Sequence, residues 1–316
     1  MGEYIARRLL ATLLTALGLS LLIFFIMRLI PGTVVEQLLG PNSFAPKEAI
    51  ESLKQMFGLD RPLYVQYFNW MKNIFVGGWG LDYKSAQPVL SLLLKKIPVS
   101  AELGFLAVLW SLIIGVPMGV IAAVRRNRFS DNFIRIISTL GLSIPAFWQG
   151  TLLILLFSVH LNWMPPFQWV QFWEDPIKNL TIIALPALTL GTATAAMITR
   201  LTRSTMLEVL SMDYVQTARS KGLVERAVIL KHALRNSLIP VITVAGVQMG
   251  YILGGIVVIE EVFSLPGVGR LLMNALFERN YPLVQGNILL FGLLFMGINL
   301  LVDLSYLFLD PRIRYE

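Results

Sequence analysis

Residues 214–240, which read YVQTARSKGLVERAVILKHALRNSLIP, hold the side chains best suited to contact another molecule. The segment is basic and amphipathic, and a single glycine, Gly222, interrupts it. It lies between two apolar runs, each long enough to cross a bilayer. A polar segment in that position indicates contact with something outside the membrane.

Residues for covalent or metal chemistry are scarce in the rest of the chain. There is no cysteine, which excludes disulfides and thiolate metal sites. The two histidines, His160 and His232, fall on opposite sides of the membrane in the topology derived below, which excludes a paired-histidine metal site. No Gly-x-x-x-x-Gly-Lys-Ser/Thr phosphate loop occurs. We therefore expect no catalytic residue, no metal ligand and no bound cofactor on this chain.

The composition is that of an all-α polytopic membrane protein. Apolar residues make up 56% of the 316, charged residues 14%, and the mean hydropathy is +0.69. At about 1.5 Å of rise per residue, roughly 20 residues cross the ~30 Å hydrocarbon core. Six runs are long enough for transmembrane helices: Leu9–Ile30, Ala101–Val124, Ile136–Val159, Leu180–Ile198, Leu238–Ile259 and Gly286–Leu309. The first is too long for a cleavable signal peptide, and we expect it to be retained.

The distribution of charge predicts the orientation of these helices. Fifteen Lys and Arg stand against seven Asp and Glu in the N-terminal arm, residues 125–135, residues 200–235 and the C-terminal tail. The three intervening segments carry eleven of each sign. This bias places both termini and residues 200–235 in the cytoplasm. The sequence pI near 9.7 therefore reflects topology, and basic residues split among short loops do not favour nucleic-acid binding.

About 68 residues between the first two runs are expected outside the cytoplasm. Prolines and glycines predict three short helices there: Lys47–Phe57 after Pro46 and before Gly58, one from Pro62 to Gly77, and Pro88–Ile97. The segment either shields the outer mouth or docks a partner. It suggests two domains: 1–98, the first transmembrane helix with the extracytoplasmic helices, and 99–316, a permease core of five transmembrane helices with a coupling loop at 200–237.

The apolar runs hold few charges but many small residues. Charged groups deep in the membrane are nearly absent, which argues against a self-sufficient channel or secondary transporter, since coupling there usually needs buried ionisable groups. Glycines such as Gly115, Gly119 and Gly191 let helix backbones approach closely. The energy for any transport must then come from a partner.

The segment after residue 212 has helix signals. Asp213–Lys221 suits a short helix that Gly222 ends in the left-handed conformation, and the amphipathic stretch Leu223–Leu234 returns the chain to the membrane. A small Ala218 and a flexible Gly222 suit a helix pressed into a cleft of another protein.

Residues 216–222, Gln-Thr-Ala-Arg-Ser-Lys-Gly, resemble the coupling-loop motif of ABC importer permeases, Glu-Ala-Ala followed after three residues by Gly. More closely, residues 214–222 and 231–236 resemble the B subunits of dipeptide and oligopeptide permeases. The same family is resembled at Arg7–Leu9, Arg28–Gly32, Gly58–Leu63, Val262–Leu271, Asn280–Gly286 and Leu309–Tyr315. The chain departs from the general motif in Gln216-Thr217 for Glu-Ala, and in Leu234-Arg235 where Leu-Pro is usual.

The resemblance implies a type I ABC importer permease in a bacterial or archaeal inner membrane. Its partners would be a homologous second permease, two ATPase subunits that hold ATP and Mg, and an extracytoplasmic substrate-binding protein. Movement of the ATPases would be transmitted through a coupling loop formed by Asp213, Tyr214, Gln216, Thr217, Ala218, Arg219, Lys221 and Gly222. Relatives of this branch carry peptides, nickel, glutathione or oligosaccharides, and we expect di- or oligopeptides.

A second candidate surface lies at the outer end of the fifth run. Pro266-Gly267-Val268-Gly269 predicts a re-entrant or surface turn, since Pro and Gly end the preceding helix. The turn either is a structural corner or docks the binding protein. The residues for docking would be Glu260, Glu261, Pro266, Gly267, Gly269 and Arg270.

The predicted topology can be tested by cysteine labelling, because the chain has no cysteine of its own. A Ser52→Cys variant should react with a membrane-impermeant maleimide in intact cells, and Ser220→Cys should react only after the membrane is opened. The opposite pattern of labelling would exclude this orientation.

Overall fold

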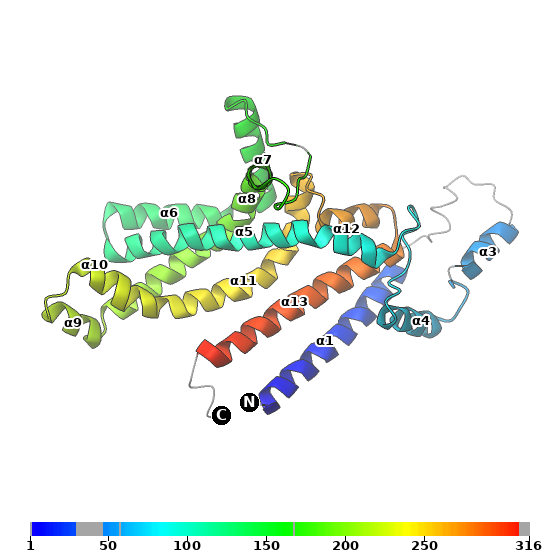
Figure 1. Cartoon of the computed structure of the whole chain (residues 1–316), viewed down its shortest axis with the longest axis horizontal. Helices are drawn as coiled ribbons and strands as arrows, with labels where there is room; N and C mark the ends of the chain where they lie inside the picture. Colours follow the sequence, from blue (N-terminus) through cyan, green and yellow to red (C-terminus); the bar gives the residue numbers. More distant parts are fainter. Residues whose placement is uncertain (1, 30–46, 57, 167, 310–316) are drawn as a thin grey trace. The chain divides into compact units, whose positions relative to one another are not determined.

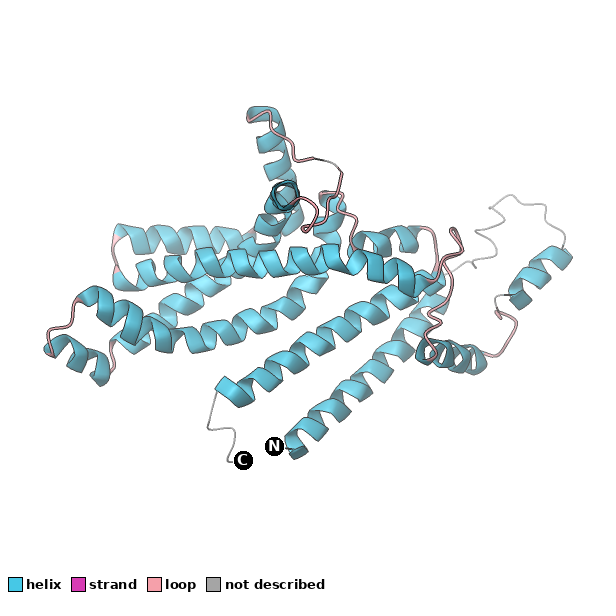
Figure 2. Ribbon diagram, in the orientation of Figure 1, coloured by secondary structure: helices cyan, strands magenta, loops and turns pink. Residues whose placement is uncertain are grey.

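The structure is a computed structural model that describes residues 2–29, 47–56, 58–166 and 168–309. Helices joined by loops make up these ranges, with one isolated bridge between Leu81 and Pro88 and no strand among the described residues (Figure 2). In chain order the helices are α1 (Gly2–Leu29), α3 (Lys47–Met56), α4 (Leu63–Phe75), α5 (Val89–Val124), α6 (Phe129–Ser143), α7 (Ala146–Leu155), η1 (Leu156–His160), α8 (Pro176–Leu210), α9 (Asp213–Ser220), α10 (Glu225–Ala227), η2 (Val228–Ala233), α11 (Leu234–Val262), α12 (Val268–Phe277) and α13 (Tyr281–Leu309) (Figure 1).

The apolar runs form the long helices, as the sequence predicts. Five stretches among the described residues are long and apolar enough to cross a membrane, in α1, α5, α8, the continuous helix from α10 to α11, and α13. With 36 and 35 residues, α5 and α8 are each about 50 Å long, well beyond the ~30 Å hydrocarbon core. Both helices therefore continue outside the membrane.

The third run is not the single helix that the sequence predicts. Instead α6 and α7 meet at an angle of 104°, so the chain has six spans only if this bent pair counts as one. Ile144 between them is extended, with φ −83° and ψ 123°. Pro145 follows it, and a proline removes a backbone donor and disfavours helical geometry in the residue before it. That constraint breaks the run.

The outer segment agrees with the sequence in two helices and differs in the third. The helices α3 and α4 occupy the predicted places, with Gly58 and Gly77 at positive φ after them. Pro88–Ile97 is not a separate helix, because Val89 begins α5, which continues through Pro98 to Val124. Helices in membrane proteins tolerate proline where neighbouring groups satisfy the freed carbonyl. The predicted flanking residues Pro46 and Phe57, residues 30–32 and residues 310–315 of the quoted motifs lie outside the described residues.

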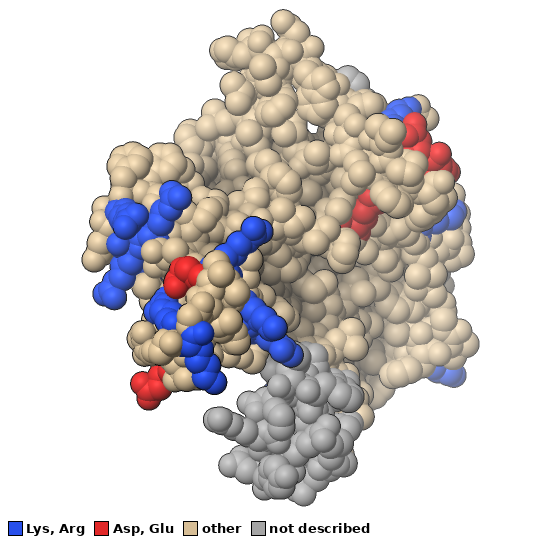
Figure 3. Space-filling model, turned by 60° about the vertical axis from the view of Figure 1, so that its left-hand side comes forward, with Lys and Arg blue, Asp and Glu red and all other residues tan. Residues whose placement is uncertain are grey.

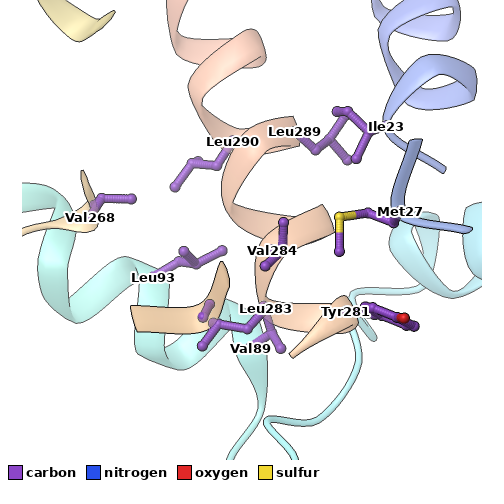
Figure 4. Close-up of a cluster of buried hydrophobic side chains, with 11 residues drawn as sticks. Ile23, Met27, Val89, Leu93, Val268, Tyr281, Leu283, Val284, Leu289 and Leu290 are labelled. Atoms are coloured by element: carbon purple, nitrogen blue, oxygen red, sulfur yellow. The ribbon is translucent and has the colours of Figure 1, made fainter. Parts of the chain in front are cut away.

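The chain forms two compact units, and each is described by itself. The first comprises residues 1–99 and 266–296. Its core joins side chains of α1, α5, α12 and α13, among them Ile23, Leu93, Val268 and Val284 (Figure 4). The loop before α5 is fixed to the same unit, since Asn280 and Ser85 both donate hydrogen bonds to the Asp82 carboxylate. The functional division at residue 98 stays a prediction.

The second unit comprises residues 100–265 and 297–316, and α8 is its central helix. It packs against α6, α7 and α11. It also meets α5 at van der Waals distance, because a Cβ on Gly119 would lie 2.5 Å from Thr202 Cβ and one on Gly191 would lie 2.6 Å from the Ala107 carbonyl oxygen. The glycines of the apolar runs therefore serve close helix packing here, as the sequence indicates.

A Gly119→Leu substitution should separate α5 from α8, since the added side chain has no space beside Thr202. Overpacking of this kind costs about 1–3 kcal/mol, and the thermal unfolding midpoint of the detergent-solubilised chain should fall. Gly254→Leu is the matched control, because no atom lies within 4 Å of a Cβ at Gly254. Equal shifts in the two variants would contradict this account.

Candidate functional site

The segment between α8 and α11 is built of short helical pieces. The first residues of the predicted loop 200–237 continue α8 to Leu210, and α9 then fills Asp213–Ser220, as predicted to within one residue. The chain returns through α10 and η2 into α11 (Figure 1). The whole segment is therefore an extension of two long helices, with α9 at its turning point.

The end of α9 is fixed by a glycine in the left-handed conformation. Gly222 has φ 75°, and its N–H donates to the Arg219 carbonyl at 2.9 Å. The Leu223 N–H donates to the Ala218 carbonyl at 3.4 Å. These two bonds form a Schellman motif, which satisfies the last carbonyls of the helix. The role predicted for Gly222 as the end of the helix is confirmed.

One face of α9 packs against this chain itself. Val215 is fully buried and Ala218 is 7% exposed. They lie in an apolar cluster formed with the end of α5, the end of α8 and η2, whose buried members are Ala123, Met206, Val209, Val228 and Ala233. The sequence suggested that Ala218 is small so that it fits a partner's cleft. In the structure its small size is required by contacts within the chain.

Polar contacts hold α9 at both ends. At its start, the Tyr214 hydroxyl accepts a hydrogen bond of 2.7 Å from the Asn236 amide, at the beginning of α11. At its end, the Arg219 guanidinium makes two hydrogen bonds to the Glu225 carboxylate, at 2.8 and 3.2 Å. Glu225 raises the pKa of Arg219 above its usual value through these bonds. With the buried face, these contacts make α9 and the start of α11 one structural piece.

The other face of α9 is open. The exposed residues of the predicted coupling set are Asp213, Tyr214, Gln216, Thr217, Lys221 and Gly222, and Arg219 is half-buried. A short helix that is held from behind and presents polar groups in front is suited to receive a protein partner. Among the described residues, no three His, Asp or Glu side chains lie close enough to hold a metal ion.

Two features of this region have no clear signal in the sequence. One is η2, a π-helical turn between α10 and α11, which widens the helix where it packs on α9. The other is an ion pair between α6 and α8, in which Arg203 Nε and Nη2 donate to the two Asp131 oxygens at 2.7 and 2.8 Å. The Asp131 side chain is fully buried. This paired fork geometry fixes α6 against the helix that leads into α9.

The outer-mouth residues are divided between buried and exposed positions. The Glu260 side chain is fully buried and accepts a hydrogen bond from Ser100, whereas Glu261 is exposed. After them the chain turns through Ser264, with φ 57°, and Leu265 donates to the Glu260 carbonyl. Glu260 therefore has a structural contact within its unit.

The rest of the predicted outer set lies in the other unit. Gly267 precedes α12, a short apolar helix, and both it and Gly269 are buried, whereas Pro266 and Arg270 are half-buried. The predicted turn is therefore a turn followed by a helix, and a docking role for these residues stays a prediction.

Comparison with known proteins identifies what the chain is similar to. Residues 115–315 match the family described as binding-protein-dependent transport system inner membrane component, and residues 1–104 match the N-terminal part of such membrane components. The glutathione transport system permease protein GsiC of Escherichia coli (strain K12) is 42% identical over 316 residues, all of both chains. The protein of the same name from Shigella dysenteriae serotype 1 (strain Sd197) is equally similar over the same length.

The inward direction of Ala218 can be tested by its effect on α9. Ala218→Leu should overpack the cluster at a cost of about 1–3 kcal/mol and loosen the helix. Amide hydrogen exchange in residues 213–222 should then become faster. Thr217→Leu places the same side chain on the exposed face and should leave the exchange unchanged. Faster exchange in both variants, or in neither, would mean that α9 is not seated by this cluster.

Proposed function

The chain belongs to the family of inner-membrane components of binding-protein-dependent transport systems, and on that premise we propose that it is one of two homologous permease subunits of an ATP-driven importer of di- or oligopeptides. It would form half of the translocation pathway. A second permease, two ATPases and an extracytoplasmic binding protein would complete the system, with ATP and Mg on the ATPases. Both termini and α9 would lie in the cytoplasm.

The observation that carries the coupling role is the way α9 is built. Its outward face is polar and exposed, whereas its inward face packs on the ends of α5, α8 and η2. The Tyr214–Asn236 and Arg219–Glu225 contacts prevent it from moving alone. An ATPase that closes against α9 would therefore displace the helix ends together with it, and such rigid-body displacement is the usual way in which domain closure changes a pathway.

A further link extends this displacement to α6. The Arg203–Asp131 ion pair joins α8 to α6 a few residues before α8 ends. Removal of either partner would leave a buried charge without its counterion, which costs several kcal/mol. We infer that α6 follows α8 when α9 moves.

Relatives at full length favour one alternative substrate. GsiC proteins are named as permeases for glutathione, which is itself a small peptide, so uptake of glutathione by this chain is the second candidate function. Nickel and oligosaccharides have no such support. The separate binding protein would deliver the substrate, and isothermal titration of that protein with glutathione and with dipeptides would distinguish the two functions. The outer residues Glu261 and Arg270 are proposed as part of its docking surface.

The coupling role predicts a sharp difference between two substitutions at Gly222. No atom lies within 4 Å of a Cβ at this position, so a side chain there is penalised only by the left-handed backbone. Valine should lose about 1–2 kcal/mol in that conformation, whereas asparagine adopts it more readily. Gly222→Val should therefore insert in the membrane but fail to couple ATP hydrolysis to uptake, and Gly222→Asn should retain coupling.

The measurements are substrate uptake, ATPase activity stimulated by the binding protein, and co-purification of the ATPases. Wild-type values of all three in Gly222→Val would refute the coupling role of α9. Loss of function in Gly222→Asn as well would show that the backbone conformation is not the cause.

A further inference from the structure

The turn between α5 and α6 carries a basic cluster without acidic partners. Arg125, Arg126 and Arg128 are exposed, and none of them forms an ion pair among the described residues. The one acid of the turn region, Asp131, is fully buried and bound to Arg203 of α8. The Arg203–Asp131 pair therefore removes the negative charge from this surface and leaves the three arginines uncompensated. Figure 3 shows basic side chains gathered on one side of that view, with few acidic ones between them.

An exposed aromatic pair adjoins the arginines. Phe129 is 84% exposed and Phe133 51% exposed, and their rings stack with centroids 5.9 Å apart. They begin an apolar stripe along α6 that continues through Ile136, Ile137 and Leu140, all exposed. The opposite face of α6, with Asp131, Ile134 and Ser138, is the buried one. The exposed stripe thus has the spacing of one helix face and the side chains of a surface against acyl chains.

Arginines at the end of such a stripe have a defined chemical complement. In the orientation proposed above the turn lies at the cytoplasmic surface, where anionic lipids attract basic side chains. A guanidinium matches the oxygens of a phosphate, and its aliphatic stem can follow the apolar surface while the charge stays in the headgroup region. Large apolar rings below it would contact the first part of the acyl chains.

We propose that Arg125, Arg126 and Arg128, together with the Phe129–Phe133 pair, form a binding site for the headgroup of an anionic phospholipid. The charge of the cluster complements the lipid phosphate, and the aromatic pair gives the lipid a fixed position beside α6. The site rests on the proposed orientation of the chain, but it makes no use of α9 or of its coupling role. It would hold the outward face of α6 in the lipid while the inward face stays bound to α8.

The test measures lipid retention by the full-length chain. The chain is reconstituted in nanodiscs of phosphatidylcholine with a minority of phosphatidylglycerol, extracted in mild detergent, and analysed for the phosphatidylglycerol that remains bound. The Arg125→Gln/Arg126→Gln/Arg128→Gln variant should retain less, by about fivefold for each arginine removed at low ionic strength. Phe129→Ser/Phe133→Ser should also retain less, although it changes no charge.

The matched control removes the same charge elsewhere. Arg226, Lys231 and Arg235 are exposed basic residues of the segment between α9 and α11, and their triple glutamine variant should keep its lipid. Equal losses in both triple variants would overturn the proposal, because the effect would then be one of net charge. Competition by soluble glycerol phosphate as strong as that by the lipid would also overturn it, in favour of a simple anion site.

A protein occupant gives a different result. If the arginine variant keeps its phosphatidylglycerol but loses a co-purifying permease or ATPase, the cluster is a protein interface and the proposal is wrong. Failure of the transporter function is recognised separately, since lipid retention is measured without substrate, ATP or transport.

Discussion

The packing of α9 on the ends of α5, α8 and η2 is the contact on which the candidate site depends. Val215 and Ala218 occupy a space that exists only because three helix ends converge there. A larger group at Ala218 would separate them, and a helix without this apolar face would be an eight-residue segment too short to be stable alone. The exposed polar face of α9 thus owes its position to the buried one. A partner that binds α9 meets a surface already ordered, so little conformational entropy is lost on binding.

Features that are encoded locally could be predicted from the sequence. The end of α9 at Gly222 follows from the conformational freedom of a single residue, and the apolar runs follow from the length needed to cross a bilayer. The family inferred from residues 216–222 is confirmed, because that inference rested on residue types along the chain. The positions of α3 and α4 were likewise given by prolines and glycines beside them.

Features that depend on distant residues could not be predicted in this way. Pro98, Pro186 and Pro240 all lie inside continuous helices, whereas the chain breaks at Pro145. Nothing beside these prolines distinguishes them, since a helix continues only where packed neighbours satisfy the freed carbonyl. The Asp131–Arg203 pair joins residues 72 positions apart, and charge counting alone treats both as topology signals. The inward direction of Ala218 was missed for the same reason, because the cluster that surrounds it comes from three separate helices.

The bend between α6 and α7 has a consequence for the backbone itself. The last carbonyls of one helix and the first N–H groups of the next have no partner within their own helix, and no side chain caps the start of α7. Counted as one span, the pair places these groups within the depth of the bilayer, where acyl chains offer no hydrogen bond. The bend must therefore face water, another polypeptide or a polar solute. A break in one helix in this way marks where the membrane's interior ceases to be hydrocarbon.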